Sequence, residues 1–297
     1  MLEFVPILPT DRPIITAYTF PSSRRNCDMS FANLCSWRFL FQTCYTTWRD
    51  FLLIKFEIEG RQVYMLPVGG DNLSEAIDVL ADDAHAHGQR LTMAGVCEDM
   101  VEEINRRMPG RFDFEADRNY ADYVYRRADL SSLAGRHLQP KRNHANRFRH
   151  LHPDYQYVSL SPAHIDECLE LEAAWYAANP AHRHIGTDNE RRSLTFALTH
   201  FEALGLTGGL LRTEGRAVAF TFGSPIGRDT FGVHVEKADV SVEGAYAAIN
   251  QEFVSRLPER FVYVNREEDL GIEGLRRAKL SYQPAIILFK YLATEHE

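Results

Sequence analysis

The sequence predicts an α+β protein made of two similar halves, and two observations support this fold class. Residues 56–69 and 211–224 both read as β-hairpins, and they share a Glu-Gly-Arg-x-Val centre at an offset of 155 residues. In each half a helix, a strand, a second helix and a last strand follow the hairpin, with one added strand in the second half. A single Glu-Gly-Arg hairpin arises easily by chance, because glycine suits a tight turn. The matched order is the stronger evidence, and it indicates a divergent duplication with a mixed, mostly antiparallel sheet and flanking helices in each half.

Hydrophobic periodicity places the elements of both halves. The first half is expected to contain helices over residues 73–87 and 98–108 and strands over 90–95 and 112–125. The second half is expected to contain strands over residues 230–236, 261–264 and 285–291 and helices over 244–257 and 271–280. Residues 129–150 are predicted to form a basic linking helix, in which Pro140 begins the second part. The predicted boundaries are therefore 1–128, 129–150 and 151–297, with a polar loop over 181–187 in the last of these.

Composition limits the classes of protein that need to be considered. A length of 297 residues allows a large core and about two domains. The net charge of −8 argues against a general binder of nucleic acid or anionic membranes. The apolar runs are far shorter than the ~20 residues that cross a bilayer, and the N-terminus does not read as a secretion signal. Five scattered cysteines without a Cys-x-x-Cys pair favour a reduced, cytoplasmic compartment, and no metal site is predicted.

A dense polar cluster follows the strand predicted over residues 261–264. Its members are Asn265, Arg266, Glu267, Glu268 and Asp269. In the helix that comes next, Ile272, Leu275 and Leu280 are expected to form an inward stripe, while Arg276, Arg277 and Lys279 project cations beside the acids. A strand that ends in such a cluster and then returns as another apolar strand is typical of a binding or catalytic site.

Three stretches of the sequence resemble one known family. They are DLSSLAGRHLQPKRNHANRF (residues 129–148), VEKADVSVEGAYAAINQEF (235–253) and FVYVNREEDLGIEGLRRAKLSYQPAIILFKY (261–291). In this order they resemble the catalytic domain of phosphatidylglycerol lysyltransferases and its relatives, the DUF2156 group, which are built from the GNAT acyltransferase fold. The resemblance covers most of the chain and implies two tandem GNAT-like domains, with a transferase site in the second and a mainly supporting role for the first.

The resemblance also implies where a donor would bind. In GNAT folds the strand, loop and helix that correspond to residues 232–244 hold the donor on backbone amides, and a helix start is a favourable place for an anion. The donor-binding residues implied in this way are Glu236, Lys237, Ala238, Gly244, Asn265, Arg276 and Lys279. The alternative for residues 232–244 is an ordinary connection between a strand and a helix, without a binding role. The basic block supplies Lys141, Arg142, Asn143 and Asn146 as contacts to a phosphate or nucleic acid, although a charged helix face is the commoner meaning of such a run.

Three residues are implied to be catalytic. Glu267 and Asp269 lie where a GNAT sheet opens between donor and acceptor, so either carboxylate is expected to bind an amine or take its proton. The alternative for each is a solvated turn with surface ion pairs worth ~0–1 kcal/mol. Tyr282 lies where many GNAT enzymes place the tyrosine that protonates the leaving group, although a tyrosine at a strand edge more often serves packing alone.

The predicted function is transfer of an aminoacyl or acyl group from an activated donor to an amine or hydroxyl by direct attack. The donor is an aminoacyl-tRNA, with tRNA then a partner, or an acyl-CoA, and the cofactor is otherwise unknown, with no metal. The acceptor is a small molecule or a lipid headgroup, and no integral membrane segment is predicted. A non-catalytic, GNAT-like ligand-binding protein is the alternative, and it would bind a ligand without turnover.

Overall fold

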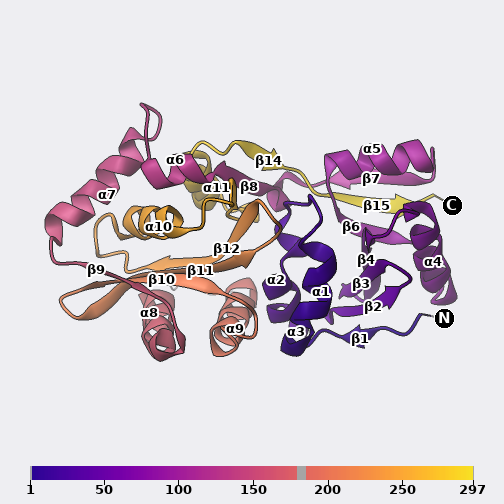
Figure 1. Cartoon of the computed structure of the whole chain (residues 1–297), viewed down its shortest axis with the longest axis horizontal. Helices are drawn as coiled ribbons and strands as arrows, with labels where there is room; N and C mark the ends of the chain where they lie inside the picture. The colour runs from indigo at the N-terminus through magenta and orange to yellow at the C-terminus, as the bar shows by residue number, and fades with distance from the viewer. Residues whose placement is uncertain (1, 179–184, 297) are drawn as a thin grey trace.

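Two β-sheets lie side by side along the long axis of the molecule, with helices against their faces (Figure 1). The computed structural model describes residues 2–178 and 185–296. Part of the polar loop predicted over 181–187 lies outside the described residues, and its last three residues belong to a helix instead. The predicted class, α+β with two mixed sheets and flanking helices, is confirmed.

The first half of the chain supplies most of the first sheet. Its strands are β1 (Val5–Pro6), β2 (Cys44–Trp48), β3 (Phe51–Ile58), β4 (Arg61–Met65), β5 (Val68–Gly69), β6 (Thr92–Val96), β7 (Phe112–Ala116) and β15 (Tyr291–Glu295). Their order across the sheet is β1-β2-β3-β4-β6-β15-β7, and β5 pairs with β3. The long helix α4 (Leu73–Ala86) presents an apolar stripe that includes Leu73, Ile77 and Leu80, and α5 (Glu98–Arg107) adds Met100 and Ile104 to the same core.

Three short helices of the first half lie between the two sheets. They are α1 (Arg12–Thr19), α2 (Phe31–Ser36) and α3 (Arg38–Phe41), and Ser30 caps the start of α2. Leu34 of α2 belongs to a buried apolar cluster that continues into Leu198 and Phe220 of the second half. The cores of the two halves are therefore joined.

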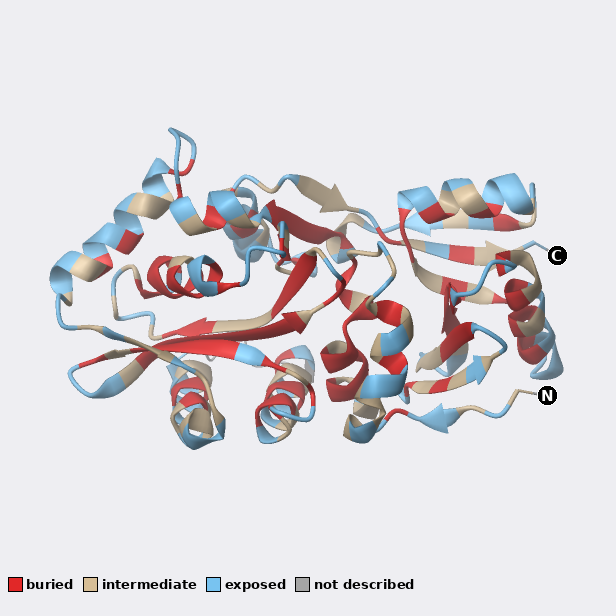
Figure 2. Cartoon of the chain, in the orientation of Figure 1, coloured by how far each residue is buried: buried red, intermediate tan, exposed pale blue. Residues whose placement is uncertain are grey.

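The second half of the chain forms most of the second sheet. Its strands are β8 (Asp122–Arg126), β9 (Gln156–Ser159), β10 (Thr207–Thr213), β11 (Arg216–Pro225), β12 (Thr230–Ala238), β13 (Tyr263–Asn265) and β14 (Ile286–Leu288), in the order β14-β8-β13-β12-β11-β10-β9. Helices α8 (Ile165–Ala178) and α9 (Ile185–Thr199) cover one face, and α10 (Ala245–Arg256) covers the other (Figure 1). Buried residues run along β11, β12 and α10 (Figure 2). The helices α6 (Arg127–Ser132) and α7 (Gln139–Leu151) pack against α10, and α11 (Glu273–Leu280) follows β13.

The two hairpins with the shared sequence have the same turn geometry. Glu59 and Gly60 join β3 to β4 with φ angles of 51° and 76°, and Glu214 and Gly215 join β10 to β11 with 51° and 79°. Positive φ at both turn residues is the signature of a type I′ hairpin, whose twist matches that of the strands. This likeness supports the predicted duplication.

The sheets exchange two strands. β8 precedes residue 128 but pairs with β13 and β14 in the second sheet, and β15 ends the chain but pairs with β6 and β7 in the first. The strand predicted over residues 112–125 is thus divided into β7 and β8, because the polar turn at 117–120 redirects the chain. The strand predicted over 285–291 is likewise divided into β14 and β15. The boundaries predicted at 128 and 151 therefore do not coincide with the sheets.

The linking region has the predicted helical character. It contains α6 and α7, and Pro140 lies in the first turn of α7, where its missing N–H is not needed. No helix in the described part of the chain is long and apolar enough to span a membrane.

Candidate active site

The parallel strands β12 and β13 separate soon after they pair. Their pairing covers only Thr230–Gly232 against Tyr263–Asn265, and β12 then continues to Ala238. The chain after Asn265 instead follows β8, since the backbone N–H of Arg266 donates to the carbonyl of Tyr123 at 2.9 Å. Glu236 of β12 and Arg266, which follows β13, meet at this divergence.

A buried ion pair crosses the divergence. Arg266 Nη2 donates to Glu236 Oε1 at 2.9 Å, and the side chains are only 12% and 11% exposed. Asn250 of α10 donates to the other oxygen of Glu236 at 2.9 Å. Arg266 Nη1 and Asn250 Oδ1 are buried and have no hydrogen-bond partner among the described residues. Since buried polar groups are almost always paired, these two atoms can each still bond to a water molecule or a ligand.

Tyr282 and Lys141 lie beside this ion pair. The guanidinium of Arg266 lies 4.7 Å from the ring centroid of Tyr282, and the ammonium of Lys141 on α7 lies 4.5 Å from it. Burial raises the pKa of Tyr282 to about 12, and Arg266 partly opposes this rise. Burial, followed by repulsion from Arg266, lowers the pKa of Lys141. The phenol therefore remains protonated at neutral pH and can donate a proton.

Glu267 follows Arg266 and is held in an unusual conformation. Its φ angle is 59°, in the left-handed region, which costs a residue with a side chain on the order of 1 kcal/mol. Its backbone N–H donates to Asn265 Oδ1 at 2.7 Å, and Asn265 is itself fully buried. Asn265 donates to the carboxylate of Asp122 and to the carbonyl of Arg25, both at 2.7 Å. Asn265 therefore shapes the turn that directs Glu267, and its side chain is not free to contact a donor.

His234 of β12 is hydrogen-bonded to Glu267. The register between β11 and β12 shifts by one residue here, since Phe222 pairs with Val235 but Gly223 pairs with Val233. His234 is thus the extra residue of a β-bulge, a feature that redirects a side chain. Its Nδ1 lies 2.8 Å from Glu267 Oε1.

Residues of the first half complete this arrangement. Asn33 Nδ2 donates to Glu267 Oε1 at 2.8 Å, and Ser30 Oγ lies 3.1 Å from His234 Nε2. Ser224 Oγ of β11 lies 2.8 Å from the same nitrogen. Sequence reasoning did not identify these four residues. His234 could have been found as a polar residue within an apolar strand, but Ser30 and Asn33 lie more than 200 residues away in the chain and carry no local signal.

Asp269 has very different surroundings. Its carboxylate is fully buried and accepts hydrogen bonds from Arg276 at 2.8 Å, from the hydroxyl of Tyr123 and from the N–H of Gly271 at 2.8 Å. Burial acts to raise the pKa of Asp269, but the hydrogen bonds from Arg276 and Tyr123 outweigh it and hold the pKa well below its usual range. A carboxylate with so low a pKa is a poor base, so Asp269 serves to hold the loop together. The geometry favours Glu267 as the base. Arg276, which also donates to Asn119, is occupied by these contacts.

The predicted inward stripe of α11 is wrong. Ile272, Leu275 and Leu280 are 39%, 37% and 43% exposed, whereas Lys279 is the buried residue of this helix. The ammonium of Lys279 donates to the backbone carbonyls of Arg266 and Glu268. These bonds explain the orientation of α11, because the loop carbonyls would otherwise be buried without donors. Lys279 supports the site and does not face a donor.

The strand and helix predicted to bind the donor, β12 and α10, are adjacent, but the side chains of β12 point to opposite faces of the sheet. Lys237 Nζ lies 2.7 Å from Glu190 of α9 and 3.7 Å from the ring centroid of Trp175 on α8, on the face of the sheet opposite Asn250. Gly244 begins α10 with a φ of 80°. A Cβ at Gly244 would lie 2.2 Å from the carbonyl oxygen of His144, so α7 packs closely over the start of α10. Glu236 is thus the member of this group that joins the divergence, whereas Lys237 and its neighbour Ala238 do not.

The basic face of α7 contributes mainly through Lys141. Arg142 donates to the carbonyls of Leu133 and Gly135, and it stabilises the turn after α6. Asn143 is exposed, and Asn146 accepts a hydrogen bond from Arg149 at 3.4 Å. Within the described residues, Lys141 is the predicted phosphate contact that reaches the ion pair.

A second buried polar cluster joins the two halves. Cys27, Asp122 and Glu268 bring potential metal ligands together, but the ammonium of Lys290 lies among them, 3.0 Å from Asp122 and in contact with Glu268. The single positive charge of Lys290 therefore offsets part of the negative charge of this cluster.

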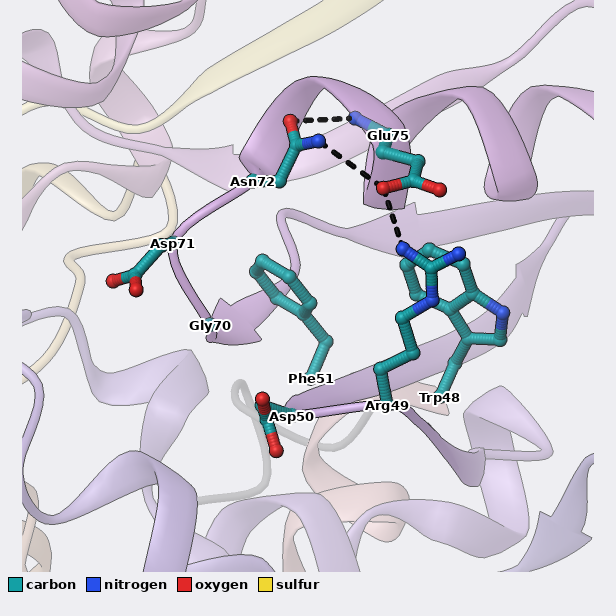
Figure 3. A pocket seen from close by; sticks show the side chains of 8 residues that line it. All are labelled: Trp48, Arg49, Asp50, Phe51, Gly70, Asp71, Asn72 and Glu75. Carbon is teal, nitrogen blue, oxygen red and sulfur yellow. Dashed lines mark hydrogen bonds and ion pairs between the residues drawn. The ribbon is translucent and has the colours of Figure 1, made fainter.

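The pocket in Figure 3 lies on the first sheet, away from the divergence. It has a volume of about 210 Å³ and is lined by Trp48, Arg49, Asp50, Phe51, Gly70, Asp71, Asn72 and Glu75. Arg49 and Glu75 form an ion pair of 2.6 Å across it, as the close-up shows. A second pocket is lined by residues of α9. None of the predicted site residues lines either pocket.

Comparison with solved structures supports the fold. The chain is 54% identical to a conserved protein of unknown function from Bacteroides thetaiotaomicron, with a TM-score of 0.97 and coverage of 100% of both chains. It shares the fold of L-PGS from Bacillus licheniformis (TM-score 0.69, 14% identity, 99% of this chain and 93% of that chain). It also shares the fold of a DUF2156 domain from Agrobacterium fabrum (TM-score 0.67, 13% identity, 97% and 92%). A search of curated proteins gives no match.

The predicted resemblance is confirmed at the level of the family. The family model described as "Phosphatidylglycerol lysyltransferase, C-terminal" matches residues 20–294, which include every residue of the divergence. The two mixed sheets of this chain have the same fold as these two structures. The chain therefore belongs to the phosphatidylglycerol lysyltransferase C-terminal family.

Proposed function

We propose that the chain transfers an aminoacyl or acyl group from an activated donor to an amine or hydroxyl acceptor at the divergence of β12 and β13. Membership of the family supports an acyltransferase-type function. The observation that carries the proposal is the buried Arg266, whose Nη1 has no partner among the described residues. The ring of Tyr282, a protonated phenol, lies 4.7 Å from the guanidinium of Arg266, and Glu267 is the next residue along the chain.

The proposed reaction is a direct attack. The acceptor N–H or O–H attacks the donor carbonyl carbon, and Glu267 takes the proton as the new bond forms. The carbonyl electrons move onto oxygen, and Arg266 Nη1 stabilises this negative charge in a site with little water. When the carbonyl re-forms, the bond to the leaving oxygen or sulfur breaks, and Tyr282 supplies the proton that the leaving group needs. No enzyme-bound acyl intermediate is needed.

Two donors fit this chemistry, an aminoacyl-tRNA and an acyl-CoA. Lys141 approaches the ion pair from α7, and a cation in this position suits the phosphates of either donor. The acceptor proposed from the family description is a hydroxyl of a phospholipid headgroup, with a small amine or alcohol as the alternative.

One observation favours a second candidate, a ligand-binding protein without turnover. The Glu236–Arg266 pair closes the divergence, and the pockets described above lie elsewhere on the described part of the chain. A binding protein would engage a donor through the unpaired Nη1 of Arg266 without completing transfer.

The test is a transfer assay with both donors. The chain is incubated with labelled aminoacyl-tRNAs or acyl-CoAs, and with vesicles containing phosphatidylglycerol or with small amines. Transfer from one donor supports the proposal. Transfer from tRNA should fall steeply as salt rises, because each phosphate contact releases counterions. Thermal stabilisation by a donor with no transfer to any acceptor would favour the binding protein instead.

A further inference from the structure

A chain of hydrogen bonds leads from Glu267 into the core between the two sheets. Glu267 Oε1 lies 2.8 Å from His234 Nδ1, and His234 Nε2 lies 2.8 Å from Ser224 Oγ and 3.1 Å from Ser30 Oγ. The two hydroxyls lie 3.0 Å apart. The order carboxylate, imidazole, hydroxyl is that of a catalytic triad, here assembled from β11, β12, the loop after β13 and the start of α2.

The positions of the protons follow from what each group can donate. An ionised carboxylate only accepts hydrogen bonds, so Nδ1 of a neutral His234 carries the proton. Nε2 is then the acceptor, and a serine hydroxyl donates to it. With two hydroxyls next to Nε2, the imidazole is held in one tautomer and one orientation.

The serines are too buried to act as nucleophiles. Ser30 and Ser224 are 0% and 4% exposed, so an acyl donor does not reach either oxygen. The role left for this chain of hydrogen bonds is to orient the carboxylate of Glu267. His234 and Asn33 both donate to Oε1 of Glu267. Its Oε2 has no hydrogen-bond partner within residues 2–178 and 185–296, and the side chain is partly exposed.

We propose that His234 is a positioning residue that directs the free oxygen of Glu267 toward the acceptor, and that Ser30 and Asn33 of the first half hold it in place. This inference rests on the proposed transferase function. It gives the first half a direct part in the site, because Ser30 and Asn33 belong to the start and first turn of α2. The two donors occupy Oε1 and leave Oε2 to take the proton of the acceptor.

Two substitutions of His234 separate positioning from packing. In His234→Asn the amide nitrogen takes the place of Nδ1 and can still donate to Glu267. In His234→Gln the amide nitrogen takes the place of Nε2, so the bond to Glu267 is lost. We expect His234→Gln to lower kcat about 100-fold with little change in KM, and His234→Asn to stay within about 10-fold of wild type. His200→Gln is the matched control, because the His200 ring bonds to a carbonyl one turn back in the chain, that of Phe196 at 2.9 Å, and not to a residue of the site.

A double variant and a spectrum complete the test. In the Glu267→Gln background, His234→Gln should cause no further loss, because residues that act as a unit are not additive. Nitrogen NMR of the unsubstituted chain should show His234 protonated on Nδ1. Equal losses in His234→Asn and His234→Gln, additivity with Glu267→Gln, or a proton on Nε2 would each overturn the inference. Absence of transfer by the wild-type chain with both donors would instead overturn the proposed function itself.

Discussion

At the scale of single residues, the site combines a strained carboxylate with a buried cation. Glu267 has a positive φ, and Arg266 beside it has a buried nitrogen without a partner among the described residues. Each feature costs stability, and such costs concentrate at functional sites. Asp269, two residues later, has neither feature, because its carboxylate is fully paired. Sequence reasoning identified both acids but could not choose between them, since Asp269 takes its partners from β8 and α11 and Glu267 takes its own from β12 and α2.

The ion pair between Glu236 and Arg266 leads to a stability prediction. Arg266→Met should lower the free energy of unfolding by about 3 kcal/mol, because Glu236 would remain charged, buried and without its cation. Urea unfolding measures the loss. The double variant Glu236→Gln with Arg266→Met should lose less than Arg266→Met alone. Equal losses in the single and double variants would show that the charge of Glu236 is not held by Arg266.

At the scale of elements, the start of α10 is shaped by α7. Gly244→Ala should lower the free energy of unfolding by more than 2 kcal/mol, roughly the combined cost of a left-handed alanine and a clash with the backbone of His144. The control is Gly60→Ala, which has a φ of 76° but open space around the new Cβ. It should lose only about 1 kcal/mol. Thermal unfolding of both variants tests this, and similar losses would mean that α7 yields freely at this contact.

The elements that sequence reasoning placed correctly are those with strong local signals. The repeated hairpins, the basic helix with Pro140 and the helix after residue 244 depend on turn, capping and periodic patterns. The stripe on α11 was wrong because a tertiary contact decided the outcome. The hydrogen bonds from Lys279 to the loop carbonyls determine which face of α11 is buried. The apolar periodicity of the helix does not determine it.

At the scale of the whole molecule, the exchange of β8 and β15 binds the halves into one unit. Each half would lose a strand of its sheet if the chain were cut between them. We therefore expect residues 1–128 and 151–297, expressed separately, to remain unfolded, and the intact chain to show one unfolding transition by calorimetry. Circular dichroism of the fragments provides a second measurement. Two separate transitions, or a folded fragment, would contradict this coupling.

The cluster around Lys290 makes stability depend on pH. Burial acts to raise the pKa of Glu268, but the charge and hydrogen bond of Lys290 outweigh it and lower the pKa from 4.5 to about 2. Because the pKa of the folded state is below that of the unfolded state, the stabilisation is present above pH 4.5 and is lost as the pH falls toward 2. Glu268→Gln should thus be less stable than wild type at pH 7, and the gap should narrow below pH 4.5. A constant gap from pH 7 to pH 3 would show that Glu268 gains nothing from Lys290.

Contacts between the halves were beyond sequence reasoning for a physical reason. His234, Ser30 and Asn33 meet only after the sheets have packed, and no local pattern encodes that meeting. By contrast, the contact between Glu236 and Arg266 follows from the parallel pairing of β12 and β13, which are neighbours in the sheet.

The most direct test of the central claim is the rate of transfer by Glu267→Gln beside that of the wild-type chain, under single-turnover conditions with the donor that supports activity. Gln keeps the shape of the side chain but cannot take a proton from the acceptor. We predict that transfer falls at least about 100-fold while the melting temperature and the affinity for donor stay close to wild type. Transfer at the wild-type rate would remove Glu267 from the reaction and contradict an active site at the divergence of β12 and β13.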